Sequence, residues 1–444
     1  MASLMQALAI ADSTQAADVF IRRFADSRSI IDRESDQSPS RSSAQALRGV
    51  PITVKDNFDV AGFITTAGSR LLAAAKPALT DAPVVARLRA AGAVILGHTN
   101  MTEFAFSGLG INPHYGTPRN PAFRNDTHIP GGSSSGAAVS VALGITPVAL
   151  GTDTGGSVRI PAAFCGLVGF KPTARHISRD GVLPLSTSLD SVGVIATAVA
   201  DCRTVFELIR DQPSDPRARR PRPALSALRL AVVRGYVDED IEPDVGNAIQ
   251  AFMQRLRDAG ASLSEIRIPE LAAIPAMQAK GTLSAAEAYA WHQTYLAQHG
   301  EMYDPRVRAR IERGASISAE QYRDLQEARA TFARMFSSRI APFDAVLWPT
   351  TPISAPRLDA LTAAESYDRC NLRVLRNSTI VNLADGCAIS LPCPQSTVPA
   401  GMTLAARHGQ DAHLLDVAEI IEEAANLSQP AGTFRLADFF PPGH

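Results

Sequence analysis

Two serines beside glycines and one upstream lysine are the residues of this chain whose types and spacing could do chemistry. Ser133 lies in a run of two glycines and three serines, and Ser157 follows the pair Gly155-Gly156. Lys55 lies in the segment Pro-Ile-Thr-Val-Lys-Asp-Asn. A serine hydroxyl attacks a carbonyl only when a base takes its proton, and a lysine can be that base when burial keeps it neutral. The three residues therefore predict acyl transfer from an amide, with a nucleophile, a proton relay and a base.

The residues before Ser157 predict the donors that such a reaction needs. Glycines let the backbone turn tightly, so that consecutive N–H groups can point in one direction. The N–H groups of Thr154, Gly155, Gly156 and Ser157 can therefore form an oxyanion hole. One donor of this kind is worth about 3 kcal/mol in other enzymes.

Short apolar strands that alternate with helices must position these residues. Residues 49–54 have the apolar, β-branched pattern of a buried strand, and Lys55 follows at its end. A strand over 147–150 and a helix over 158–164 enclose Ser157. The same alternation, with a helix over 81–91 and a strand over 93–96, continues to about residue 200. It predicts an α/β protein with a central mixed sheet and helices on both faces.

The rest of the chain continues this organisation, and we expect a single domain over residues 1–444. Its parts are N-terminal helices in 1–30, a catalytic core in 49–200, a Pro/Arg-rich linker in 211–226, and the remainder of the sheet with substrate-pocket helices in 228–444. Within the last part we expect strands over 228–233, 345–348 and 387–391, and helices over 245–259, 280–340 and 411–425. The arginines of the linker could contact nucleic acid, although a solvated linker is the ordinary interpretation.

The composition indicates a soluble globular protein. Hydrophobic residues make up 45% of the 444 residues and charged residues 20%, and the net charge of −1 gives no field to attract nucleic acid or an anionic membrane. Five scattered cysteines favour buried thiols in a reducing compartment. The N-terminus lacks a basic segment, and the apolar stretch 136–150 is too short to span a bilayer. We expect a cytoplasmic protein with no metal and no cofactor.

Three motifs within residues 131–173 match one known pattern. They are the Gly-Gly-Ser-Ser start, the core Gly-x-Asp-Thr-Gly-Gly-Ser-x-Arg-x-Pro-Ala-Ala-Phe-Cys-Gly, and the Gly-x-Lys-Pro-Thr close. In these motifs the chain resembles the amidase signature family. The lysine segment 51–57 and the segment 381–392 also resemble that family, so the resemblance covers nearly the whole chain.

The resemblance implies a role for each motif residue. Ser157 matches the acyl-accepting serine, Ser133 the bridging serine and Lys55 the base. The bridging serine of the family follows a cis peptide bond, so the resemblance implies a cis bond at Gly132–Ser133. Asp153 matches a residue that supports the site by hydrogen bonding, and we place Gly132 and Ser134 with it as supporting residues. Ser135 stands where the family commonly has glycine, and we expect it to narrow or polarise the wall near the leaving group.

The resemblance implies a hydrolase of linear amides, ureas or carbamates that releases ammonia or an amine. We expect a small-molecule amide as its ligand, with no nucleic acid and no membrane, and leave a homodimer or a small accessory subunit open. Arg159, Arg373 and Arg376 are candidates to bind a substrate carboxylate, and each has a structural ion pair as its alternative. Because arginines flank the motif regions, we favour a small, carboxylate-bearing amide.

Three other interpretations compete with this one. Residues 132–136 fit the Gly-x-Ser-x-Gly elbow of α/β-hydrolases with Ser134 at its centre, but that elbow needs a preceding strand and residues 121–130 are loop-like. A non-catalytic amidase-like subunit is disfavoured by the intact triad. The main alternative is the glutamine-hydrolysing amidase subunit of a tRNA-dependent amidotransferase, to which the segment 381–384 is similar.

Overall fold

The computed structural model describes residues 2–24, 46–212, 222–279, 281–394, 396–427 and 430–439. Most of the predicted linker 211–226 therefore lies outside the described residues, including three of its arginines. The fourth, Arg222, forms an ion pair with Glu423 at 2.8 Å.

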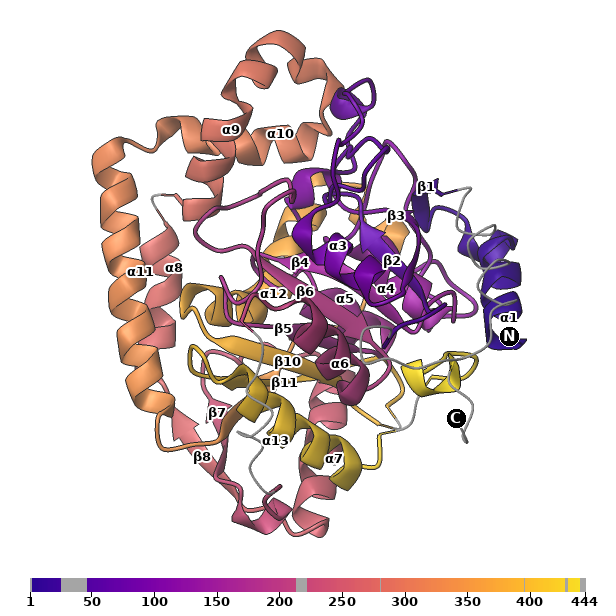
Figure 1. Ribbon diagram of the computed structural model, residues 1–444. Helices are drawn as coiled ribbons and strands as arrows, with labels where there is room; N and C mark the ends of the chain where they lie inside the picture. The colour runs from indigo at the N-terminus through magenta and orange to yellow at the C-terminus, as the bar shows by residue number, and fades with distance from the viewer. Residues whose placement is uncertain are drawn as a thin grey trace.

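Eleven strands of the described chain form one mixed sheet, as the sequence predicts (Figure 1). Their spatial order is β1-β3-β2-β4-β6-β5-β10-β11-β9-β7-β8. The pairs β3–β2–β4 and β9–β7–β8 are parallel, and the other neighbours are antiparallel. The strands are β1 Phe20–Arg23, β2 Pro51–Lys55, β3 Val94–Thr99, β4 Val148–Asp153, β5 Val168–Lys171, β6 Ser191–Ala196, β7 Leu230–Arg234, β8 Leu263–Arg267, β9 Ala345–Pro349, β10 Cys387–Pro392 and β11 Gly401–Ala406.

Helices cover both faces of this sheet. In β4, Val148 and Leu150 pack in the core that contains α3, α6, α7 and α13, whereas Ala149 packs on the opposite face with α4 and α5. Further along that second face, α11 and α12 pack against β7, β9 and β11. The helices are α1 Ala2–Ala11, α3 Pro83–Ala90, α4 Ser135–Ala142, α5 Arg159–Cys165, α6 Val199–Ile209, α7 Pro243–Asp258, α8 Ile274–Gln278, α9 Leu283–His299, α10 Pro305–Glu312, α11 Ala319–Ile340, α12 Ala364–Leu383 and α13 Asp411–Ala424.

The N-terminal segment departs from the prediction. Residues 1–30 are expected to be helical, and α1 confirms a helix in their first part. However, Phe20–Arg23 form β1, which pairs antiparallel with β3 at the edge of the sheet. The open edge of β3 offers backbone partners to a short segment that begins with an aromatic and a β-branched residue, so tertiary pairing decides its structure.

Two neighbouring parallel strands bring the motif residues together. Val54 of β2 pairs with Leu150 of β4, and both strands run in the same direction. Their carboxyl ends therefore meet at the same edge of the sheet, which places Lys55 close to Thr152 and Asp153. The following turn holds Ser157 and leads into α5, while α4 follows Ser133 and Ser134.

None of the helices that the structure describes combines the length and the hydrophobicity of a membrane-spanning segment.

Candidate active site

Lys55 is a wholly buried lysine at the end of β2. Its Nζ lies 2.7 Å from Ser133 Oγ and 2.8 Å from Thr152 Oγ1. Burial lowers the pKa of Lys55 to about 7, although the nearby carboxyl groups of Asp190 and Asp153 act in the opposite direction. A large fraction of Lys55 is therefore neutral at neutral pH, as a general base requires.

Ser133 is held between Lys55 and the backbone of a neighbouring loop. The Gly132–Ser133 peptide bond is cis, as the family resemblance implies. The Ser133 carbonyl accepts a hydrogen bond from Thr102 N–H at 3.1 Å, and Gly132 N–H donates to Gly108 O at 2.8 Å. The Ser133 hydroxyl is thereby fixed against the lysine amine.

Ser157 lies next to this pair and faces a cavity. Its carbonyl accepts a hydrogen bond from Ser134 N–H at 3.2 Å, which ties the loop of Ser157 to the residue after Ser133. The Ser134 hydroxyl bonds to Thr152 O at 3.4 Å. Only 4% of Ser157 is exposed, yet Ser157 lines a pocket of about 840 Å³ with Thr154 and Gly155. A substrate in this pocket would therefore lie against Ser157.

The loop that precedes Ser157 requires glycine, but not all of its N–H groups are available as predicted. Gly156 has a φ of +125°, and a side-chain carbon there would clash with Ser378. Its N–H donates to Asp153 Oδ1 at 2.9 Å. The prediction that Gly156 is an oxyanion donor is therefore corrected, because the Asp153 carboxylate already accepts this hydrogen. The N–H groups of Thr154, Gly155 and Ser157 are the remaining candidates.

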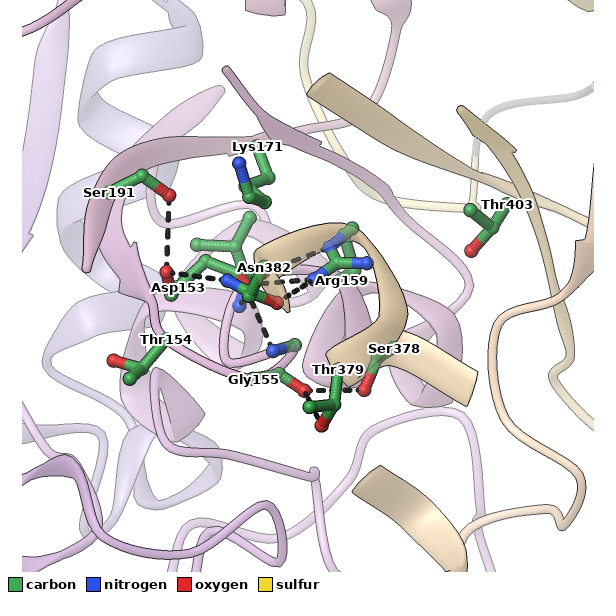
Figure 2. Close-up of polar contacts among 12 residues, drawn as sticks. Asp153, Thr154, Gly155, Arg159, Lys171, Ser191, Ser378, Thr379, Asn382 and Thr403 are labelled. Carbon is green, nitrogen blue, oxygen red and sulfur yellow. Dashed lines mark hydrogen bonds and ion pairs between the residues drawn. The ribbon is translucent and has the colours of Figure 1, made fainter. Parts of the chain in front are cut away.

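Asp153 organises this loop through a buried ion pair. Figure 2 shows its carboxylate between Arg159 and Asn382, while its carbonyl accepts a bond from Ser191. The two guanidinium contacts from Arg159 measure 3.1 and 2.9 Å, and Asn382 Nδ2 donates at 2.9 Å. Burial alone would raise the pKa of Asp153, but Arg159, together with Lys171 and Asn382, outweighs it and holds the pKa at about 2.

These contacts correct the role predicted for Arg159. Its side chain is wholly buried, paired with Asp153, and absent from the described residues that line the pocket. Arg159 therefore forms the structural ion pair that the sequence analysis gave as its alternative role. It is not placed to bind a substrate carboxylate in the pocket.

The comparisons with known proteins agree with this geometry. A model of the family described as Amidase matches residues 3–415. This chain belongs to the amidase signature family. It is a hydrolase of carbon–nitrogen bonds other than peptide bonds.

Relatives of this amidase differ in the reactions that their names give. The chain is 35% identical over 404 residues to 2-amino-5-chloromuconic acid deaminase of Comamonas testosteroni, covering 88% of this chain and 84% of that one. It is 36% identical over 409 residues to one of the subunits of glutamyl-tRNA(Gln) amidotransferase from Symbiobacterium thermophilum, covering 84% and 82%. A crystal structure of an amidase superposes with a TM-score of 0.83 at 29% identity, covering 96% of both chains.

Helix α12 of the amidase supports the site, and the sequence did not reveal it. Ser378 Oγ and Thr379 Oγ1 both donate to Gly155 O, at 2.6 and 3.3 Å (Figure 2). Asn382, one turn further, bridges Asp153 and Arg159. The sequence signal that could have indicated this role was the group of hydroxyl and amide side chains at 378, 379 and 382, just before a buried strand.

Thr152 and Asp190 also contact the site without having been predicted. Thr152 Oγ1 accepts hydrogen bonds from Lys55 and, at 3.3 Å, from Asn57. Asp190 accepts one from Thr154 Oγ1 at 2.5 Å, and its pKa is raised by burial. Thr152 lies within the signature motif, whereas Asp190 lies beyond it and had no pattern to mark it.

Two of the three predicted substrate arginines line the pocket of the amidase. Arg373 and Arg376 extend from α12 into its wall, and three further arginines that were not predicted join them from α10, the following turn and α11. Ser135, in contrast, is wholly buried at the start of α4, and its hydroxyl donates to Asn100 O at 3.3 Å. The expectation that Ser135 shapes the leaving-group wall is therefore corrected.

The arrangement excludes the nucleophile elbow. Residues 121–130 form no strand; their one β-bridge joins His128 to Arg357. Ser134 is wholly buried and its hydroxyl contacts a backbone carbonyl. In the described part of the chain, no three His, Cys, Asp or Glu side chains are grouped so that they could hold a metal ion.

Proposed function

We propose that this amidase hydrolyses a carboxylic amide through an acyl-enzyme on Ser157. The observation that carries the proposal is the 2.7 Å contact between Ser133 Oγ and the amine of the wholly buried Lys55, beside the loop that presents Ser157 to the pocket. Neutral Lys55 accepts the Ser133 proton, and Ser133 accepts the proton of Ser157.

The reaction then balances in two stages. Ser157 Oγ bonds to the substrate carbonyl carbon, and the backbone N–H groups of Thr154, Gly155 and Ser157 stabilise the charge on the carbonyl oxygen. The C–N bond breaks as Ser133 returns a proton to the leaving nitrogen and is resupplied by Lys55. A water molecule then attacks the ester carbonyl carbon and gives a proton to Lys55 through Ser133. The bond from that carbon to Ser157 Oγ breaks as the proton returns through Ser133 to Ser157, and the acid is released.

A serine-directed fluorophosphonate probe tests the nucleophile. We expect one covalent adduct per chain in the intact mass of the wild type and of Ser134→Ala, and none in Ser157→Ala. We also expect Ser157→Ala to lower amide turnover by about 10³-fold or more while the protein stays folded. Full turnover by Ser157→Ala, or loss of the adduct in Ser134→Ala alone, would contradict the proposal.

The second candidate is the glutamine-hydrolysing component of an amidotransferase. It is favoured by the 36% identity to a subunit of such a complex. Tight co-purification with a second protein, together with tRNA-dependent amidation by the complex, would support it. Hydrolysis of simple amides by the isolated chain favours the free amidase.

We also propose that the amidase is one domain located in the cytoplasm. All five cysteines are unpaired thiols, and a reducing compartment preserves such thiols. The continuous sheet supports the single domain. Denaturant unfolding that follows one transition by two probes would agree with it.

A further inference from the structure

Arginines dominate the charge of the pocket that Ser157 faces. Five line it: Arg310, Arg313, Arg329, Arg373 and Arg376. Among the described residues that line the pocket, none is an aspartate or a glutamate. A guanidinium stays protonated at any physiological pH, so the wall of the pocket presents positive charge to a ligand.

Carboxylates that do not line the pocket neutralise part of this positive charge. Arg310 pairs with Asp368 at 2.7 Å, and Arg373 pairs with Asp240 at 3.1 Å. Arg313 lies 3.8 Å from the same Asp368 carboxylate, and Arg329 lies 3.9 Å from Asp385. The five positive charges of the pocket therefore outnumber the three carboxylates near them, which are Asp240, Asp368 and Asp385.

Arg376 differs from the other four because, among the described residues, it forms no ion pair with a carboxylate. Its guanidinium donates to Glu239 O and, at 3.1 Å, to Asn377 Oδ1, and it lies over the ring of Tyr236. In the part of the chain that the structure describes, no carboxylate lies within 4 Å of it. Burial lowers the pKa of Arg376 by more than Tyr236, Asp240 and Glu239 together raise it. An anionic ligand would compensate the charge of Arg376.

Arg376 lies on the same helix as a residue that contacts the loop before Ser157. Arg376 precedes Thr379 by three residues in α12, and Thr379 Oγ1 contacts Gly155 O. Side chains three residues apart are neighbours on a helix, with Cβ atoms about 5–6 Å apart. Arg376, Gly155 and Ser157 also line the same pocket, so one short ligand can contact both Arg376 and the nucleophile.

We propose that the substrate is a half-amide of a short dicarboxylic acid, and that Arg376 binds its free carboxylate. This inference rests on the proposed acyl-enzyme at Ser157, because the acyl chain must extend from that serine into the pocket. A guanidinium and a carboxylate form charge-assisted hydrogen bonds with matching geometry.

Paired substrates test the substrate class. Amides of the three- to six-carbon dicarboxylic acids are compared with neutral amides of equal chain length, such as succinamic acid with butyramide. We expect the half-amide to have a kcat/KM at least about tenfold higher, since a hydrogen bond to a charged group contributes on that scale. Equal kcat/KM values for the two series would overturn the proposal.

Variants test the role of Arg376. We expect Arg376→Gln to lower kcat/KM for the half-amide by about 10–100-fold and that for the neutral amide by less than about threefold. Arg376→Lys should retain part of the preference. Arg308→Gln is the charge-matched control, because Arg308 pairs with Glu312 and is not among the lining residues. An equal loss on both substrates in Arg376→Gln would contradict the assigned role.

A binding measurement separates this inference from the proposed mechanism. Calorimetric titration with malonate, succinate and glutarate needs no turnover. We expect at least one of them to bind the wild type and Ser157→Ala, with affinity lowered about tenfold or more in Arg376→Gln. If no dicarboxylate binds the wild type, the inference fails even when Ser157 is the nucleophile. If binding depends on Arg376 but Ser157→Ala retains turnover, the mechanism fails instead.

Discussion

At the scale of single residues, the protonation state of Lys55 decides whether the site can work. Its wholly buried amine lies between two hydroxyl oxygens, and burial has moved its pKa into the neutral range. The same burial that makes Lys55 a base therefore makes the reaction sensitive to acid.

We predict that kcat/KM falls on acidification through pH 7. Below the Lys55 pKa of about 7 the amine holds a proton and cannot accept one from Ser133, so the rate falls about tenfold for each further pH unit. Above it the rate reaches a plateau. Rates on a neutral amide between pH 5 and 9 measure this, and a flat profile would exclude the relay.

Asp153 carries the second residue-scale prediction. Asp153→Asn leaves Arg159 charged, buried and without its carboxylate, so we expect the free energy of unfolding in urea to fall by about 3–5 kcal/mol. The double variant Asp153→Asn/Arg159→Met removes both charges and should regain part of the loss. Equal stabilities of the single and double variants would argue against the unpaired charge as the cause.

The pH dependence of stability follows from the same carboxyl group. The pKa of Asp153 is depressed from 3.8 to about 2 in the folded state. Its contribution to the free energy of unfolding is therefore complete at pH values above the pKa of the unfolded chain. That contribution is lost as pH falls from about 4 through 2.

At the scale of elements, α12 holds the loop that precedes the nucleophile. Its hydroxyls bind the Gly155 carbonyl and its amide binds Asp153, so one helix fixes both the loop and its ion pair. The orientation of the Gly155 peptide sets where the neighbouring N–H groups point.

We therefore predict that Ser378→Ala/Thr379→Val lowers kcat about tenfold or more and changes KM little. The removed hydrogen bonds orient donors that act on the oxyanion, which develops only in the transition state. Steady-state kinetics on a neutral amide measure kcat and KM separately. Thr362→Val, at the exposed start of the same region, is the control and should match the wild type. A rise in KM alone would assign these hydroxyls to substrate binding.

At the scale of the whole molecule, a large apolar core lies on the face of the sheet that α3, α6, α7 and α13 cover. Phe252 of α7 is wholly buried in the core shared with α3, α6 and α13. We predict that Phe252→Ala lowers the free energy of unfolding by about 3–5 kcal/mol through the cavity it leaves. Leu79→Ala removes an almost fully exposed side chain and should change it by less than about 0.5 kcal/mol.

The activity of the folded Phe252→Ala protein should stay within about twofold of the wild type at 25 °C, because distant sites act independently. A large loss of kcat in that variant would show that the core and the site are coupled.

The sequence predicted the elements that carry local signals. An apolar β-branched run marked β2, the strand predicted over 147–150 marked the start of β4, and the motif glycines marked the loop at Ser157. The cis bond and the Lys55–Ser133 contact followed from the resemblance. These features depend on residues close in sequence or on a motif.

The failures concern contacts that form only in the folded chain. Arg159 was misassigned because its ion pair with Asp153 depends on the folded turn, where Asn382 of α12 also contacts it. Gly156 was taken for a free donor because Asp153 accepts its hydrogen only in the folded turn. β1 was missed because its strand structure comes from the edge of β3.

The support that α12 gives to the Asp153 loop has a consequence for biosynthesis. Asn382 follows Asp153 by 229 residues in the chain. At a synthesis rate of 5–20 residues per second, the ribosome needs about 10–45 s to make that segment. During that interval the nascent chain holds the reactive serine without the helix that orients its loop. We therefore expect the nascent protein to gain hydrolytic competence only after α12 has been synthesised.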